Sequence, residues 1–152
     1  MIDKFDGQYA FLSNFHLTPL VYRNMRFTSS EAAFQSQKTT DPEEMQKYCD
    51  LAPGASKRKG REVKLRDNWD IIKDQIMYEV CYAKFSQNPN LMMQLLDTGD
   101  EELVEGNTWH DNTWGNCVCQ KCQDIPGRNM LGMLLMELRT EIKYEIAGGI
   151  QK

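Results

Sequence analysis

The sequence predicts an α+β fold that is predominantly helical, with a few short strands near the N-terminus and one domain over residues 1–152. Three observations support this prediction. The length, 152 residues, is typical of one domain. No repeat, low-complexity tract or linker divides the chain. After Thr28 apolar residues recur at three- and four-residue steps, which is the period of a helix with one buried face.

The strands are expected in the first 28 residues. QYAFLSNF (8–15) and LVYRNMRF (20–27) have strand-like composition, and Arg23-Asn24 can turn the second segment into a hairpin.

Helices follow. Thr28 or Ser30 can cap a helix that runs to about Thr40, and Asp41-Pro42 can begin another that ends near Asp50. A short basic helix is expected after Pro53-Gly54.

The strongest helix prediction covers Asn68 to about Gln87, where Asn88-Pro89 ends it. PNLMMQLLDTG (89–99) predicts a helix closed by Gly99, and ELVEG (102–106) predicts a short strand. Residues 106–127 form a long loop without periodicity, a feature that is often functional. A final helix is expected from 128 to about 145; its predicted buried residues are Leu131, Leu134, Leu135, Leu138 and Ile142.

Composition excludes several classes of protein. The N-terminal MIDKFDGQYAF is acidic and lacks the apolar core of a signal peptide, and no apolar run approaches the 18 or so residues of a membrane span. We therefore expect a cytoplasmic protein with no membrane partner. The net charge of −4 argues against general affinity for nucleic-acid backbone. The five cysteines are expected to be reduced thiols.

TSSEAAFQSQK (28–38) carries one carboxylate among uncharged residues. On a helix Glu31, Gln35 and Lys38 share one face, at i, i+4 and i+7. Two interpretations stand: Thr28-x-x-Glu31 is a capping box, or this face is one wall of a pocket.

WHDNTWGN (109–116) combines two tryptophans, a histidine and an aspartate. Tryptophan rings stack on flat bases, and Asp111 can act as an acid or base beside them. The alternative is a loop pinned to the core by its tryptophans, with Asp111 turning the chain.

KRKGREVKLR (57–66) holds six basic residues against one glutamate. It is either a solvated charged face or a phosphate clamp. In the clamp Arg61 and Arg66 supply forked donors, and Gly60 admits close backbone approach.

CVCQKC (117–122) offers three thiols, and with His110 they would make a four-ligand zinc set of Cys117, Cys119, Cys122 and His110. The Cys-x-Cys half is tight for one tetrahedral ion, however. We therefore expect inert thiols, no metal and no cofactor.

GRNMLGMLLMELR (127–139) is an apolar helix with Gly132 at a close contact. Arg128 and Asn129 lie where this helix begins, and its positive dipole end favours an anion.

Taken in order, several segments resemble the YbiA-like N-glycosidase family, also called NADAR domains. The matching segments are FLSNF (11–15), TSSEAAFQSQK (28–38), Gly60-Arg61, LRDNW (65–69), AKF (83–85), LVEGNTWHDNTWG (103–115) and GRNMLGMLLMELR (127–139). The resemblance covers nearly the whole chain. One difference is the cysteine cluster, which replaces a glycine-rich segment of simpler members.

The resemblance implies a mostly helical α+β enzyme that breaks N-glycosidic bonds. It implies a small-molecule nucleotide or ADP-ribosyl substrate: a ribosylaminouracil phosphate of riboflavin biosynthesis, or ADP-ribosylated guanine, including guanine in DNA or RNA. By position Glu31 matches the catalytic glutamate, Trp69 the tryptophan of the Asn-Trp pair, and Asp111 the aspartate before Trp-Gly. Lys38 and Asn129 match positions that line the same pocket.

From these residues we hypothesise that Glu31 stabilises the oxocarbenium-like sugar and orients water, while Asp111 assists. Trp69 or Trp114 stacks on the base, and Lys38 holds phosphate or traps the ring-opened aldehyde as a Schiff base. The predicted substrate-binding residues are Gln35, Asn14, Phe15, Gly60, Arg61, Arg66, Trp114, Gly115, Arg128 and Asn129.

Two other classes remain open. One is a non-catalytic module that senses ADP-ribose or NAD with the same contacts. The other is a zinc-dependent nucleic-acid-binding protein built on CVCQKC. No obligate protein partner is expected for any of them.

Overall fold

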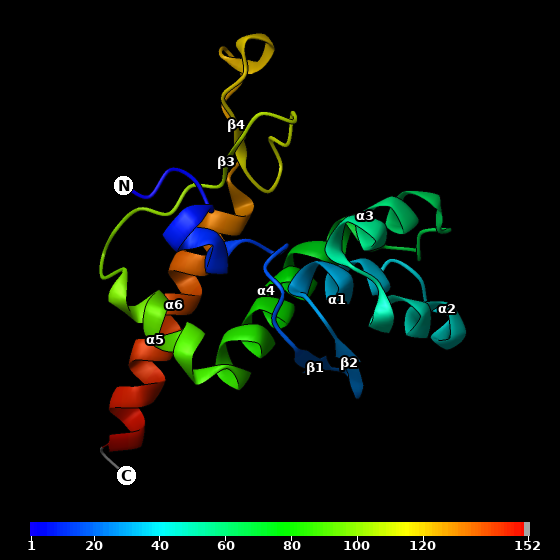
Figure 1. The fold of residues 1–152 in the computed structure, drawn as a ribbon, viewed down its shortest axis with the longest axis horizontal. Coiled ribbons are helices and arrows are strands. Elements are labelled where there is room, and N and C mark those ends of the chain that lie inside the picture. Colours follow the sequence, from blue (N-terminus) through cyan, green and yellow to red (C-terminus); the bar gives the residue numbers. More distant parts are fainter. Residues whose placement is uncertain (151–152) are drawn as a thin grey trace. The chain divides into compact units, whose positions relative to one another are not determined.

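The computed structural model describes residues 1–150, with side chains through Gly148. The chain forms two compact units: a terminal unit, made of Met1–Ser13 and the chain from Leu91 onward, and a middle unit, Asn14–Asn90. Helices dominate both units and the strands are short, so the predicted helix-rich α+β class is confirmed (Figure 1). One domain over 1–152 stays a prediction.

The middle unit pairs a small hairpin with a helical layer. Helix α1 packs against both α3 and α4. The elements are β1 (Leu20–Tyr22), β2 (Met25–Phe27), α1 (Ser30–Ser36), α2 (Pro42–Gln46), a 3₁₀ helix (Lys47–Asp50), α3 (Pro53–Glu62) and α4 (Trp69–Gln87).

The predicted hairpin is confirmed. Arg23 and Asn24 both have positive φ, 50° and 66°, as a two-residue type I′ turn requires. The antiparallel register pairs Leu20 with Phe27 and places both in the core.

Helix α1 begins differently from the prediction. Its N-cap is Ser29, whose hydroxyl accepts a hydrogen bond from the Ala32 amide at 3.1 Å. The proposed caps, Thr28 and Ser30, are therefore wrong by one residue. Because Ala32 takes the third helical position, the capping box that needs Glu31 there is also wrong. The helix ends at Ser36 rather than near Thr40.

The next helices follow the sequence signals. Asp41 caps α2 by accepting from the Glu43 amide at 3.0 Å, and Pro42 takes the first turn. The basic helix α3 begins at Pro53 as expected. The predicted bounds of helix α4 are confirmed within one residue. One face of this helix is buried and supplies apolar side chains to the core, as the periodicity predicted.

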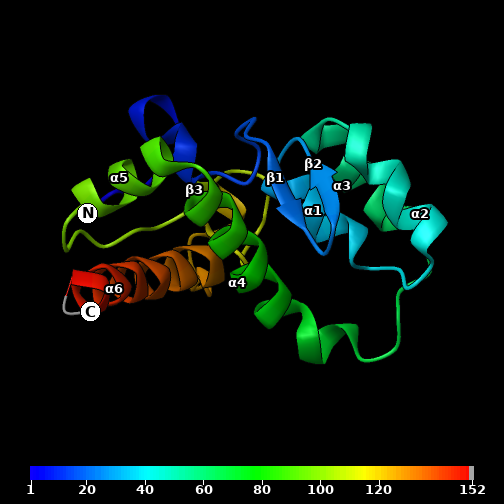
Figure 2. The same cartoon turned by 90° about the horizontal axis from the view of Figure 1, so that it is seen from below.

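In the terminal unit, α6 is one unbroken helix (Figure 2), and its five predicted core residues are all buried. Gly99 closes α5 as predicted, at φ +63°. The elements are a 3₁₀ helix (Gly7–Leu12), α5 (Pro89–Asp97, which begins in the last residues of the middle unit), β3 (Gly106–Asn107), β4 (Asn116–Cys117), a 3₁₀ helix (Gln120–Cys122) and α6 (Met130–Ile150).

Two strand predictions in this unit are wrong. Residues 8–12 of QYAFLSNF lie in the 3₁₀ helix, because adjacent Phe11 and Leu12 are both buried and a strand would send them to opposite faces. Within ELVEG, Leu103 forms a single parallel bridge with Ile2 and only the last residue, Gly106, enters a strand, β3.

Between residues 1 and 150, no helix is both long and apolar enough to cross a membrane.

Candidate active-site residues and a cysteine–histidine cluster

The carboxylate of Glu31 is buried, with 7% of the residue exposed. The Gln35 side chain, one turn further along α1 and 5% exposed, donates a hydrogen bond to Glu31 Oε1 at 3.1 Å. The side chains of Glu31 and Gln35 therefore do not face water. The predicted i, i+4 pairing is present, and it belongs to a buried wall of the middle unit.

Lys38 lies just beyond the end of α1 and is half-buried. Burial lowers its pKa below 10.5, and although the charge of Glu31 opposes this shift, Arg61, Lys57 and Lys73 add to it. The charges of the Glu31 carboxylate and of several cations therefore all affect the pKa of the Lys38 amine. Lys38 is in the electrostatic neighbourhood of Glu31, as the sequence predicted.

Gly60 brings α3 against α1. A Cβ built on Gly60 would lie 1.8 Å from Gln35 Oε1 and 3.4 Å from Lys38 Nζ. The sequence predicted close approach at this glycine but assigned it to a bound phosphate. In the structure the group that approaches is the Gln35 amide.

The basic stretch divides into members with different surroundings. Arg61 is exposed, and Lys57 Nζ lies 5.7 Å from the centre of the Phe15 ring, which is itself 44% exposed. Lys57 and Lys73 were missed by sequence reasoning. The i, i+4 spacing of Lys57 and Arg61 on α3 was the available signal.

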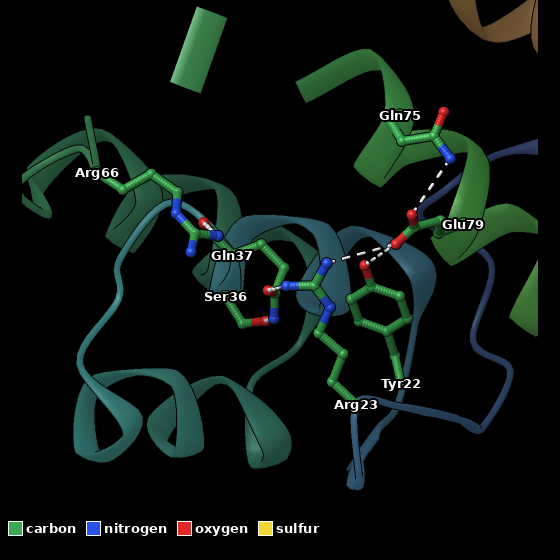
Figure 3. Close-up of polar contacts among 7 residues, drawn as sticks. All are labelled: Tyr22, Arg23, Ser36, Gln37, Arg66, Gln75 and Glu79. Atoms are coloured by element: carbon green, nitrogen blue, oxygen red, sulfur yellow. Dashed lines mark hydrogen bonds and ion pairs between the residues drawn. The ribbon is translucent and has the colours of Figure 1, made fainter. Parts of the chain in front are cut away.

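The side chain of Arg66 is hydrogen-bonded to the backbone. Its Nη1 donates to the Gln37 carbonyl at 3.2 Å, and Arg23 donates to the Gln37 side-chain oxygen at 3.1 Å (Figure 3). Glu79 on α4 accepts from Tyr22 at 2.6 Å and pairs with Arg23. This network fixes the end of α1, so Arg66 positions the segment around Lys38.

Trp69 and Asn14 both contact α1. Trp69 is 7% exposed, and its ring packs 5.2 Å from that of Phe34 at an angle of 51°. Asn14 accepts from the Ser30 hydroxyl at 2.8 Å, and its amide donates to Met77 Sδ at 3.4 Å. Both residues therefore hold the helix that carries Glu31.

Three buried polar atoms of the middle unit have no hydrogen-bond partner among the described residues: Gln35 Oε1, Tyr48 Oη and Ser56 Oγ. Burial raises the pKa of Tyr48 to about 12, so its hydroxyl keeps its proton. Buried polar groups normally find a partner, so water or a ligand is the expected complement of such atoms.

Asp111 belongs to the terminal unit, where it turns the chain. Its Oδ1 accepts hydrogen bonds from the Thr113 and Trp114 amides at 3.1 and 2.9 Å. The loop is pinned by the buried Asn107 side chain, which donates to the Asp111 carbonyl at 2.8 Å. Trp109, 58% exposed, does not anchor it, so this part of the tryptophan-pinning interpretation is wrong.

Close packing joins the start of α6 to the segment before β3. Asn129, at φ 49°, accepts from the Glu105 amide at 3.0 Å and donates to the Leu103 carbonyl at 2.9 Å. A Cβ on Gly115 would lie 2.3 Å from the Glu105 carbonyl, and one on Gly132 would lie 2.1 Å from that of Leu103. The close contact predicted at Gly132 is confirmed. The neighbouring Arg128 side chain is exposed.

Sulfur and nitrogen donors gather around β4: His110 precedes this strand, Cys117 ends it, and Cys119 and Cys122 follow it. Nδ1 of His110 lies 3.3 Å from Sγ of both Cys119 and Cys122 and 3.9 Å from Sγ of Cys117. Burial opposes ionisation of Cys117, but hydrogen bonds from Cys119, His110 and Cys122 outweigh it and lower its pKa to about 7. The Cys-x-Cys spacing does not keep these donors apart, because the four donor atoms all lie within 4.8 Å of one another.

A cavity of about 440 Å³ lies elsewhere in the terminal unit. Tyr9, Gln94, Thr98 and Glu101 are among its lining residues, and none of the residues that line it is a sequence-predicted site residue.

Comparison with known proteins agrees with the resemblance. A family model described as NADAR domain matches residues 3–143. N-glycosidase YbiA of Escherichia coli (strain K12) is 36% identical over 140 residues, which cover 90% of this chain and 84% of that protein. Riboflavin biosynthesis protein VVA0006 of Vibrio vulnificus (strain YJ016) is 34% identical over 141 residues, 91% of this chain but 37% of that protein.

A solved structure agrees as well. The NMR structure of E. coli YbiA superposes with a TM-score of 0.82 at 33% identity, over 97% of this chain and 89% of that one. The fold, the ordered motifs and the family match lead to the same conclusion: this chain belongs to the NADAR domain family.

Proposed function

We propose that this protein is an N-glycosidase that hydrolyses the ribosyl C–N bond of a phosphorylated, nucleoside-type substrate. The observation that carries the proposal is the buried Glu31 carboxylate, bonded to the Gln35 amide and set among cations that include Lys38. Relatives named N-glycosidase, YbiA of E. coli among them, support the reaction type.

The chemistry explains why a buried carboxylate is needed. As the C–N bond stretches, positive charge develops on the anomeric carbon and negative charge on the leaving base. A fixed carboxylate in a partly dry site stabilises the developing cation more than water would. Glu31 supplies this charge and orients or deprotonates the attacking water, and Gln35 holds the carboxylate in place.

The cations complement the phosphate. Three cations lie near enough to Lys38 to lower its pKa: Lys57, Arg61 and Lys73. Guanidinium and ammonium groups bind phosphate through charge-assisted hydrogen bonds. The acidic net charge is no obstacle, because a nucleotide needs only a local cationic site.

Asp111 and the tryptophans complete the proposal. Asp111 assists by protonating the leaving base or by holding the sugar hydroxyls, and Trp69 or Trp114 contacts the base. The Oδ1 atom of Asp111 already accepts two amide hydrogen bonds, which would fix the orientation of its carboxylate.

Lys38 has a second role in this proposal. Its lowered pKa increases the fraction of neutral amine, the form that condenses with the aldehyde of ring-opened ribose and expels water. Borohydride added during turnover should leave a ribosyl mass adduct on Lys38, more strongly at higher pH. If no adduct forms while product accumulates, Lys38 only binds phosphate.

The test of function is turnover of two substrates. The purified protein is incubated with an oligonucleotide carrying ADP-ribosylated guanine and, separately, with ribosylaminouracil phosphate. Freed base or sugar is followed by mass spectrometry. The printed name of the Vibrio relative supports the second substrate. Tight binding of either compound without product would overturn the proposal in favour of a sensor of ADP-ribose.

A further inference from the structure

The four donor atoms of His110, Cys117, Cys119 and Cys122 all lie within 4.8 Å of one another. Around a tetrahedral zinc, bond lengths of about 2.3 Å to sulfur and 2.0 Å to nitrogen give ligand–ligand separations of about 3.5 to 3.8 Å. The observed N–S separations of 3.3, 3.3 and 3.9 Å fall close to that range. The donors are therefore close enough together to bind a single metal ion.

The local backbone explains how a Cys-x-Cys-x-x-Cys sequence achieves this. Cys117 ends β4 and Cys119 is extended, at φ −70° and ψ 163°. Residues two apart on extended chain point to the same side, so both thiols face one centre. A 3₁₀ turn follows, in which the Cys122 amide donates to the Cys119 carbonyl at 3.0 Å, and it returns the third thiol.

The fourth donor comes from the preceding loop. β3 and β4 pair in parallel, with Asn107 opposite Cys117, so the loop that carries His110 begins beside the first thiol. The Asn107 side-chain oxygen accepts from the amides of Trp109 and Asp111, both at 3.2 Å, which brackets His110. The backbone of His110 itself is in the left-handed region, at φ 67°. The imidazole is thus held toward the thiols by specific contacts.

We propose that these residues bind one zinc ion in a closed Cys₃His structural site. Three thiolates and an imidazole are a donor set that favours zinc. Four protein ligands leave no open position for water, so the ion does not take part in hydrolysis. On binding, each of the three thiols loses its proton to solvent, and neutral His110 donates through Nδ1.

The consequence of the site is local order. Zinc would close the chain between residues 110 and 122 into a fixed loop and thereby remove much of that segment's conformational freedom. Asp111 follows His110 directly, so the metal would also fix the backbone of Asp111. The proposal does not depend on N-glycosidase activity, because it rests on the donor atoms alone.

The first test is the metal content of the whole protein, purified without chelator from zinc-sufficient culture and measured by inductively coupled plasma mass spectrometry. We expect about one zinc per chain in the wild type and in Cys49→Ser, whose thiol lies in the middle unit. Cys119→Ser and Cys122→Ser should lose most of it. Zinc-free wild-type protein that also fails to take up added zinc would overturn the proposal.

Cobalt distinguishes this site from adventitious binding. Chelated wild-type protein titrated with Co²⁺ should develop thiolate charge-transfer absorption and the visible bands of tetrahedral cobalt, saturating at about one equivalent. Should the serine variants fail to fold, His110→Cys provides the answer, because a Cys₄ set retains the metal with a changed spectrum. A spectrum of octahedral cobalt, or a disulfide found between the cluster cysteines of freshly purified protein, would contradict the proposal.

Proteolysis reports on the loop itself. Lys121 is exposed within the cluster loop, so chelation should increase trypsin cleavage there severalfold, and zinc should restore protection. Exposed Arg58 on α3 is the internal control, and its cleavage should not change. Equal cleavage at Lys121 with and without chelator would show that no metal orders this loop.

Discussion

The carboxylate of Glu31 can be replaced by an amide of nearly the same shape. Glu31→Gln keeps an acceptor oxygen for the Gln35 amide, which donates to it at 3.1 Å in the wild type, but it loses the negative charge. If that charge stabilises the developing cation, kcat should fall by about a hundredfold or more while the midpoint of thermal unfolding changes little.

Ser29→Ala is the matched control for Glu31→Gln. It removes the cap that accepts from the Ala32 amide and should cost about 1 kcal/mol of stability without a comparable loss of kcat. Glu31→Gln protein that is folded and turns over at the wild-type rate would refute the catalytic assignment.

Asp111 calls for a pair of substitutions, because its Oδ1 also holds the turn. Asp111→Asn retains an oxygen that can accept from the Thr113 and Trp114 amides, whereas Asp111→Ala does not. A role for the charge predicts that both variants lose activity by about tenfold or more, but only the alanine variant loses stability. The measurements are kcat and thermal unfolding. Normal activity in the asparagine variant would leave Asp111 as a turn residue only.

At this scale the sequence predicted contacts within a helical turn better than the helix start. The i, i+4 rule found Glu31 and Gln35 because one turn of helix fixes their separation. It did not find the cap, because Thr28, Ser29 and Ser30 all carry hydroxyls and the choice depends on a tertiary contact. That contact is the Glu31 amide donating to the Asn14 carbonyl at 3.1 Å.

The packing of α3 on α1 depends on the missing side chain of Gly60. In Gly60→Ala the new Cβ would overlap Gln35 Oε1, and Gln35 is buried and bonded to Glu31, so it cannot move without breaking that bond. We expect a loss of about 1–3 kcal/mol of stability together with reduced kcat. Unfolding and turnover are measured on the same preparations.

Helix α3 supplies a control in Gly54. A Cβ there would meet only Arg58 Nη1 at 3.6 Å, an ordinary contact. Gly54→Ala should therefore be neutral or stabilise the helix by up to about 1 kcal/mol. If both alanine variants behave alike, the contact between Gly60 and Gln35 does not shape the site.

The network at the end of α1 gives a pH dependence. Burial raises the pKa of Glu79, but hydrogen bonds from Tyr22 and Gln75 and the charge of Arg23 outweigh it, so the folded-state pKa lies below 4.5. A depressed carboxyl pKa contributes stability above the unfolded pKa, and this contribution is lost as pH falls through the folded value. Because the side chain is 37% exposed, its contribution is at most about 1 kcal/mol.

The test compares Glu79→Gln with the wild type across pH. The difference in unfolding free energy should be present at pH 7 and disappear as the pH falls below 4.5 through the folded-state pKa of Glu79. A gap between Glu79→Gln and wild type that persists at the lowest pH would show that the network does not act through the charge of Glu79.

Elements were predictable where periodicity or turn chemistry was strong. Helices α4 and α6 each have a long apolar stripe, and Arg23-Asn24 fits the hairpin turn that the structure shows. The segment 8–15 was mistaken for a strand because composition does not reveal that neighbours Phe11 and Leu12 are both buried. Clustering of His110 with the cysteines also depended on a tertiary feature, the parallel pairing of β3 with β4.

The whole molecule has a net charge of −4, yet Lys57, Arg61 and Lys73 gather near Lys38. A general nucleic-acid binder would spread its positive charge, whereas this distribution suits a single phosphorylated ligand. The sequence predicted that Arg61 and Arg66 both bind phosphate, but it could not show that the two side chains have different surroundings. The backbone bond from Arg66 to Gln37 became visible only in the folded chain.

Arg61→Gln should therefore raise KM for a phosphorylated substrate by about tenfold or more while leaving kcat within a few-fold, because a charge-assisted hydrogen bond contributes about 1.5–3 kcal/mol. Arg58→Gln, on the same helix, is the control, because Arg58 is exposed, whereas Arg61 gives one of the largest charge effects on the pKa of Lys38. Added salt should raise KM of the wild type more than that of Arg61→Gln, since screening weakens an interaction that the variant already lacks. With a dephosphorylated substrate the two enzymes should have the same KM. An equal rise of KM in both arginine variants would mean that the net field of the chain, and not a phosphate site at Arg61, governs binding.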